Sequence, residues 1–140
     1  MLETYMKVAI AQAKKARGRV SPNPLVGAVI VKKGEVVGVG YHHRAGSPHA
    51  EINALADAGQ KARNADLYVT LEPCLMCAGA LFWSRIGTLI YGTADEKRGF
   101  TLYGNRLLHN KTRIVKGIME EECREIIVKF FKNKRQNSAN

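Results

Sequence analysis

The chain has no apolar run that approaches the length of a membrane-spanning helix, although 46% of its 140 residues are hydrophobic. A bilayer requires about 20 consecutive apolar residues, so we expect no membrane partner. The N-terminal segment places lysines inside a helical pattern and has no long apolar centre, which does not fit a secretory signal peptide. These absences predict a cytoplasmic protein, and the length predicts one domain over residues 1–140.

Cysteine is scarce as well, with only Cys74, Cys77 and Cys123 in the whole chain. An odd count in which two cysteines are separated by two residues does not fit a disulfide framework. In a reducing compartment such a closely spaced pair more often binds a metal or carries redox chemistry. For Cys123 we expect a buried thiol on the last helix, whose other predicted core positions are Met119, Ile126, Ile127 and Phe130.

Acidic residues are outnumbered: 12 stand against 22 lysines and arginines, and the formal net charge is +10. The basic excess is spread over both halves of the chain instead of forming one tail. A surplus of this size favours a polyanionic partner, and we therefore expect a nucleic acid. A soluble protein that is merely basic is the alternative.

The apolar periodicity alternates between strand and helix along the chain. It predicts helices over residues 2–17, 49–58, 74–84 and 119–133, and strands over residues 26–31, 36–41, 67–71, 88–91 and 112–115. Residues 95–110 are expected to form a loop with one helical turn. Such alternation predicts an α/β fold whose sheet is covered on both faces. Because the first two strands form a hairpin, the sheet must be mixed.

One imidazole and two thiols near predicted helix starts suit a zinc ion: His49, Cys74 and Cys77. The positive helix N-terminus stabilises the thiolates. Three protein ligands leave a position for water, as in catalytic zinc sites, and zinc lowers the pKa of such a water to about 7. Glu51, two residues after His49, can face the same cavity and transfer protons without binding the metal.

Two other interpretations of the cysteine pair remain open. A structural zinc site would need a fourth ligand, which His42, His43 or His109 could supply. A thioredoxin-like redox pair is the second, although neither the preceding proline nor the order of elements fits it. The joint occurrence of His49-Ala50-Glu51 and Pro73-Cys74-Leu75-Met76-Cys77 is far more specific than either motif alone, and it matches the signature of zinc nucleobase deaminases.

On these motifs the sequence resembles the cytidine deaminase-like superfamily over nearly its whole length. The resemblance implies a three-layer α/β/α sandwich around a five-stranded mixed sheet. It also implies one zinc ion held by His49, Cys74 and Cys77, with Glu51 as proton shuttle. Members of the superfamily are often homodimers. An interface could use Leu81, Phe82 and Trp83, although core packing explains these residues equally well.

The two halves of the chain resemble different branches of the superfamily. From Thr70 onward, TLEPCLMCAGALFWSRIGTLIYGTADEKRGF looks like bacterial tRNA adenosine deaminases. That resemblance implies that Asp95 and Lys97 lie beside the nucleotide. It also implies that the terminal helix contacts the anticodon loop, with Phe130, Phe131, Lys132, Lys134 and Arg135 as the candidate contacts.

The first half, with SPNPLVGAVIV and GYHHRAGSPHAEINALADAG, looks like the deaminase domain of riboflavin biosynthesis. That resemblance implies that Asn23 and His42 face a pyrimidine and its ribose. The chain lacks the riboflavin insert between the two zinc cysteines, whose residues help to bind the substrate phosphate. The pocket for the base is expected to be lined by Asn23, Pro24, Val26, His42, Ala50, Leu71, Pro73 and Asp95.

Three functions follow from these features. The short cysteine spacing and the net charge favour deamination of adenosine to inosine at the wobble position of tRNA. The alternative is deamination of a small base or nucleotide, such as the diaminopyrimidine phosphate of the riboflavin pathway. The third is a zinc module that binds RNA without turnover. Loss of Glu51 separates it from the other two, because a deaminase without Glu51 would still bind its substrate but would lose turnover, whereas the module has no turnover to lose.

Overall fold

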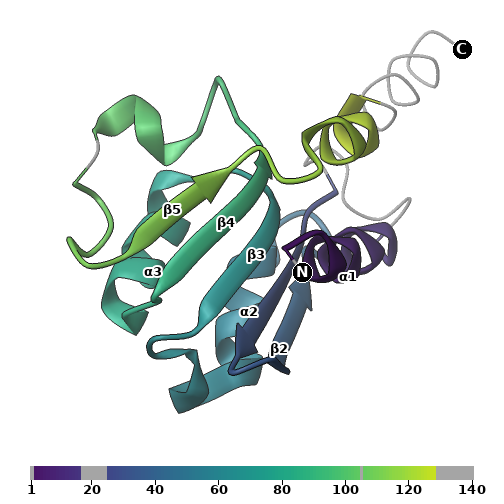
Figure 1. Cartoon of the computed structure of the whole chain (residues 1–140). Coiled ribbons are helices and arrows are strands. Elements are labelled where there is room, and N and C mark those ends of the chain that lie inside the picture. Colours follow the sequence, from purple (N-terminus) through teal and green to yellow (C-terminus); the bar gives the residue numbers. More distant parts are fainter. Residues whose placement is uncertain (1, 17–24, 105, 129–140) are drawn as a thin grey trace, which may run out of the picture.

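The computed structural model describes residues 2–16, 25–104 and 106–128. Its elements are α1 (Leu2–Lys14), β1 (Gly27–Lys32), β2 (Glu35–Tyr41), α2 (Ala50–Ala58), η1 (Gly59–Ala62), β3 (Asp66–Leu71), α3 (Leu75–Ser84), β4 (Thr88–Thr93), η2 (Phe100–Tyr103) and β5 (Arg113–Lys116). Residues 120–128 form a further helix. Figure 1 shows the strands as one twisted sheet with helices on both sides.

The sheet is mixed, with strand order β2-β1-β3-β4-β5. Strand β1 runs antiparallel to both β2 and β3, whereas β3, β4 and β5 are parallel to one another. The β1–β2 hairpin turns at Lys33 and Gly34, whose φ angles are 52° and 79°. Positive φ at both central residues matches the right-handed twist of the two strands. The predicted five-stranded mixed sheet is confirmed.

Successive residues of β1 point to opposite faces of the sheet and enter two separate cores. Ala28 and Ile30 pack with α2 and α3 in one cluster, while Val29 and Val31 pack with α1 and with Cys123 in the other. Both clusters consist of side chains that are almost fully buried. The predicted three-layer α/β/α sandwich is therefore confirmed, as is the burial of Cys123 in the last helix.

Helix α2 approaches β2 unusually closely because two residues of that strand have no side chain. A Cβ atom added at Gly40 would lie 2.5 Å from Ala54 N and closer still to Ala50 O. Polar contacts reinforce this packing: the Val39 N–H donates to Asp57 Oδ2 at 2.9 Å, and Asn53 Nδ2 donates to Tyr41 O at 2.9 Å. The first turn of α2 is thereby held against the end of β2.

Several predicted boundaries shift by one to three residues. The first helix ends at Lys14 instead of residue 17, and β4 continues to Thr93. Met119 does not belong to the last helix, because it has a positive φ of 54° and lies in a turn. The last helix is described to residue 128, so its predicted continuation to 133, with the core position Phe130, lies outside the described residues.

The suggested interface residues do not share one surface. Leu81 is 1% exposed and belongs to the core, so it cannot serve an interface. Trp83 is 77% exposed on the same helix. A homodimer stays a prediction. In the described parts of the chain, every helix is too short or too polar to traverse a bilayer.

Candidate metal centre and substrate pocket

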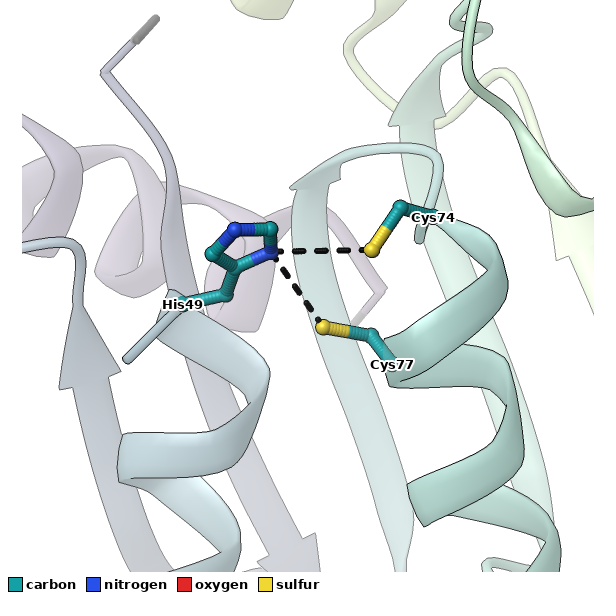
Figure 2. A group of neighbouring side chains, drawn as sticks. All are labelled: His49, Cys74 and Cys77. Atoms are coloured by element: carbon teal, nitrogen blue, oxygen red, sulfur yellow. Dashed lines mark hydrogen bonds between the residues drawn. The ribbon is translucent and has the colours of Figure 1, made fainter. Parts of the chain in front are cut away.

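Two helix starts bring three metal-binding side chains together. His49 is the N-cap residue of α2, Cys74 is the N-cap residue of α3, and Cys77 lies in the first turn of α3. Both helices pack on the same face of the sheet, so their N-termini lie side by side (Figure 1). In Figure 2 the His49 ring points at both sulfur atoms. His49 Nδ1 lies 3.6 Å from Cys74 Sγ and 3.5 Å from Cys77 Sγ.

These separations fit a zinc ion. With Zn–S bonds of about 2.3 Å and Zn–N bonds of about 2.0–2.1 Å, tetrahedral geometry places nitrogen and sulfur ligands about 3.6 Å apart. All three donor atoms lie within 4.8 Å of one another. Among the described residues, no further His, Cys or acidic side chain joins this group. A structural zinc site would need a fourth protein ligand, and the described part of the chain offers none beside these three donors.

The two thiols interact with each other directly. A hydrogen bond from the Cys77 thiol lowers the pKa of Cys74 to about 5, and the same interaction raises the pKa of Cys77. Cys74 is therefore a thiolate at neutral pH, and thiolates are the form in which cysteine binds metals. Cys74 and Cys77 would both hold a zinc ion as thiolates, so binding of the metal would release the remaining proton.

Glu51 lies in the first turn of α2, and its carboxyl group interacts with the thiol of Cys77. Its side chain is 3% exposed, and burial raises its pKa to about 7. A carboxyl group of this kind can both accept and release a proton near neutral pH, which suits a general acid-base group. The ordinary carboxylate of an exposed glutamate would hold its proton too weakly to return it to a leaving group.

A pocket opens beside the three donors, and residues from both halves of the chain line it: Val26, His42, His49, Ala50, Glu51, Leu71, Glu72, Cys74, Asp95 and Arg98. His42 is 3% exposed, and its ring meets the His49 ring edge-on at 5.5 Å between centroids. The Nδ1–H of His42 donates to Pro48 O at 3.1 Å. This buried ring forms a fixed wall of the pocket next to the metal centre.

Not every predicted pocket residue lies in the lining. Val26, His42, Ala50, Leu71 and Asp95 do, whereas Pro73 and Lys97 are not among the lining residues. The Pro73 carbonyl instead accepts the N–H of Phe100 at 2.9 Å, and the Lys97 N–H donates to Asp95 Oδ1 at 3.1 Å. The remaining predicted contacts lie outside the described residues: Asn23, Pro24, Phe130, Phe131, Lys132, Lys134 and Arg135.

Glu72 and Arg98 line the pocket and were missed by sequence reasoning. Glu72 stands immediately before Pro73-Cys74, so its position in the motif was the available signal. Arg98 lies in a segment that was expected to be a loop, and no periodicity in a loop indicates which side chain turns inward.

The sequence of the chain is similar to those of known deaminases. Residues 1–93 match the family described as the cytidine and deoxycytidylate deaminase zinc-binding region. The riboflavin biosynthesis protein RibD of Aquifex aeolicus is 45% identical over 136 residues, which cover 92% of this chain and 38% of that protein. A diaminohydroxyphosphoribosylamino-pyrimidine deaminase of Buchnera aphidicola is 39% identical over 137 residues, covering 91% of this chain and 92% of that protein.

A solved structure from a study of A-to-I editing by tRNA:A34 deaminases is also similar. It superposes with a TM-score of 0.76 at 33% identity, covering 88% of this chain and 98% of that chain. The chain thus spans only about two-fifths of the Aquifex RibD protein, but nearly all of the Buchnera deaminase and of the solved tRNA:A34 deaminase structure.

Proposed function

The chain belongs to the cytidine and deoxycytidylate deaminase family, whose zinc-binding region it carries, and we propose that its substrate is the diaminohydroxyphosphoribosylaminopyrimidine of riboflavin biosynthesis. The reaction exchanges an amine on the pyrimidine ring for a carbonyl oxygen and releases ammonia. The expected substrate was adenosine in tRNA, and the sequence relatives favour the small-molecule alternative instead.

The observation that carries this proposal is the buried position of His42 in the pocket wall beside His49. His42 belongs to the half of the chain that resembles riboflavin deaminases, and that resemblance implies a contact with the substrate. Half of the lining residues come from the same stretch, between residues 26 and 51. The similarity to the Buchnera deaminase along nearly its full length supports the same substrate.

The residues of the site divide the chemistry between them. When zinc is bound, it supplies Lewis-acid activation of a water molecule at neutral pH. Glu51 is placed to accept a proton from the attacking water and to pass it to the ring nitrogen beside the reacting carbon. A second proton, from the hydroxyl group of the addition product, would then pass through Glu51 to the departing amine. Burial of Glu51 keeps bulk water from exchanging with the transferred proton, and His42 and Asp95 hold the ring at the pocket walls.

Wobble adenosine in tRNA is the second candidate, and a specific feature favours it. Cys74 and Cys77 are separated by only two residues, without the insert that contributes to phosphate binding in the riboflavin pattern. The net charge of +10 also suits a polyanion. In that reaction Glu51 serves the same role on the adenine ring.

A direct comparison of the two substrates tests the proposal. The zinc-loaded protein is incubated with the pyrimidine ribosyl phosphate or with an anticodon stem-loop carrying adenosine at position 34, and products are identified by mass spectrometry. We expect ammonia and the deaminated pyrimidine, with no inosine. Inosine without pyrimidine turnover would transfer the function to tRNA. In that case affinity for the stem-loop should fall with salt, with a log–log slope of about −0.7 per phosphate contacted.

The same assay addresses the non-catalytic RNA-binding module. Such a protein would bind the stem-loop and turn over neither substrate, and E51Q would behave like the unaltered protein. A deaminase instead loses turnover in E51Q on whichever substrate it uses.

A further inference from the structure

Glu72 is a buried acid that lies in the pocket but belongs neither to the metal donors nor to the proton shuttle. Its side chain is 4% exposed. Its carboxylate accepts three hydrogen bonds, from Thr101 N at 3.0 Å, from Thr101 Oγ1 at 2.8 Å and from Asp95 N at 3.2 Å. Buried carboxylates are stable only when donors compensate the lost water, and here all three donors belong to residues 95–101.

The same loop lies in backbone contact with the strand end that carries Glu72. The Phe100 N–H donates to Pro73 O at 2.9 Å, and Gly99 forms an isolated antiparallel bridge with Cys74. A Cβ atom at Gly99 would collide with the Glu72 carboxylate and would lie 2.6 Å from Asp95 O. Only glycine therefore allows the loop to close over the carboxylate.

The loop itself is a compact turn organised by Asp95. Asp95 Oδ1 accepts the N–H groups of Lys97 and Arg98 at 3.1 and 3.0 Å, and Asp95 O accepts the N–H of Gly99 at 2.9 Å. Asp95 and Arg98 are the residues that this turn contributes to the pocket lining. Fixing the turn therefore fixes an acid and a cation on one wall of the pocket.

We propose that Glu72 is a positioning residue, whose buried carboxylate clamps the 95–101 loop to the zinc-binding strand end so that Asp95 and Arg98 stand at the substrate. The clamp ties substrate recognition to the metal centre, because Glu72 and the ligand Cys74 are separated only by Pro73. The donors from the loop occupy the carboxylate, which distinguishes its task from that of Glu51. The consequence for substrate binding rests on the proposed function, whereas the consequence for the loop does not.

The test uses the full chain with zinc bound and the variant E72Q. Glutamine keeps the shape of the side chain, but its amide group presents N–H donors where a carboxylate oxygen accepted a backbone N–H. Hydrogen exchange at the amides of Asp95 and Thr101 is measured first, because it requires no substrate. We expect faster exchange at both amides and one zinc ion per chain, as in the unaltered protein.

Kinetics with the pyrimidine ribosyl phosphate give the second readout. We expect E72Q to raise KM by about tenfold or more, the size expected from losing hydrogen bonds to a charged group, and to leave kcat within about threefold. E96Q is the matched control, because Glu96 is exposed in the same loop and the change in charge is identical. E96Q should leave both the exchange rates and KM unchanged.

Three results would overturn the proposal. The first is an unchanged rate of amide exchange in E72Q. The second is an unchanged KM in E72Q that holds a normal amount of zinc. The third is a loss of zinc in E72Q in which kcat falls by the same factor as kcat/KM. If E72Q does not fold, T101V replaces it, since valine keeps the backbone donor and replaces the hydroxyl group with a methyl group of similar size. T101V should raise KM in the same direction by a smaller factor, and an unaltered KM and exchange rate would contradict the clamp. If the unaltered protein deaminates no pyrimidine, the proposed substrate fails while the exchange measurement still decides on the clamp.

Discussion

Replacing Gly40 with alanine should disturb the metal centre from a position outside it. The added Cβ would lie 2.5 Å from Ala54 N, whereas ordinary contact begins at 3.4 Å, so α2 must move by about 1 Å. The contact falls on the first turn of α2, where Ala50 stands between His49 and Glu51. A 1 Å misplacement of reacting groups can cost about 10²-fold in rate, and overpacking costs about 1–3 kcal/mol of stability.

Two further glycines provide matched controls for G40A. At Gly38 the added Cβ would meet Ala54 O at 2.6 Å and Ala58 Cβ at 2.8 Å, so G38A presses on the later turns of the same helix. At Gly79 it would meet nothing within 4 Å, and alanine should stabilise α3 by about 0.5–1 kcal/mol. Urea unfolding gives stability, competition with a chelator gives zinc retention, and ammonia release gives the rate.

We expect both G38A and G40A to lose stability, but only G40A to lose about a hundredfold in rate and to release zinc more readily. G79A should retain the rate and the zinc. If G40A loses stability like G38A while its rate and zinc retention equal those of the unaltered protein, the contact between β2 and α2 does not position the site.

Two other predictions concern the thiols. Cobalt substituted for zinc should show the intense thiolate charge-transfer absorption of a tetrahedral site, weakened in C74S and C77S and unchanged in C123A; an octahedral spectrum would contradict the geometry. Burial raises the pKa of Cys123 to about 12, so the unfolded chain releases this proton from about pH 9 while the folded chain keeps it. The free energy of unfolding should therefore fall more steeply between pH 9 and pH 11 in the unaltered protein than in C123A, and equal slopes would refute this.

The metal donors could be predicted from sequence because each depends on local chemistry. Cys74 and Cys77 are three residues apart, and a helix start places such residues on one face. His49 and Glu51 are only two residues apart, and they reach the same site because His49 is the N-cap residue with an extended backbone while Glu51 lies in the first turn of α2. The alternation of strands and helices predicted a sheet covered on both faces. It did not specify that both helices pack on the same face, and this shared face is what brings His49 and Cys74 together across 25 residues.

The places of Glu72 and Arg98 in the pocket lining could not be predicted in the same way. The Glu72–Thr101 contact joins residues 29 apart, and it exists because a glycine at position 99 lets an irregular loop fold back onto a strand end. Arg98 enters the pocket for the same reason. Neither feature produces a periodic pattern in the sequence, so composition and residue spacing do not predict the positions of Glu72 and Arg98.

The last helix shows that helical periodicity can predict which residues are buried without predicting where the helix begins. Its apolar spacing placed Cys123 and Ile126 correctly in the core, because helical periodicity is a strong signal. Met119 followed the same spacing but lies in a turn with positive φ. Its apolar side chain packs against the core from that turn, so the pattern was satisfied without a helix.

We propose that this family member is a hydrolytic deaminase in which Glu51 transfers the proton beside a zinc ion. Ammonia release from the pyrimidine ribosyl phosphate, measured in parallel for the unaltered protein and E51Q with one zinc bound per chain, tests it most directly. We expect one ammonia per substrate consumed by the unaltered protein, and a rate about 10²- to 10⁴-fold lower in E51Q. A zinc-loaded E51Q that releases ammonia at the unaltered rate would contradict it.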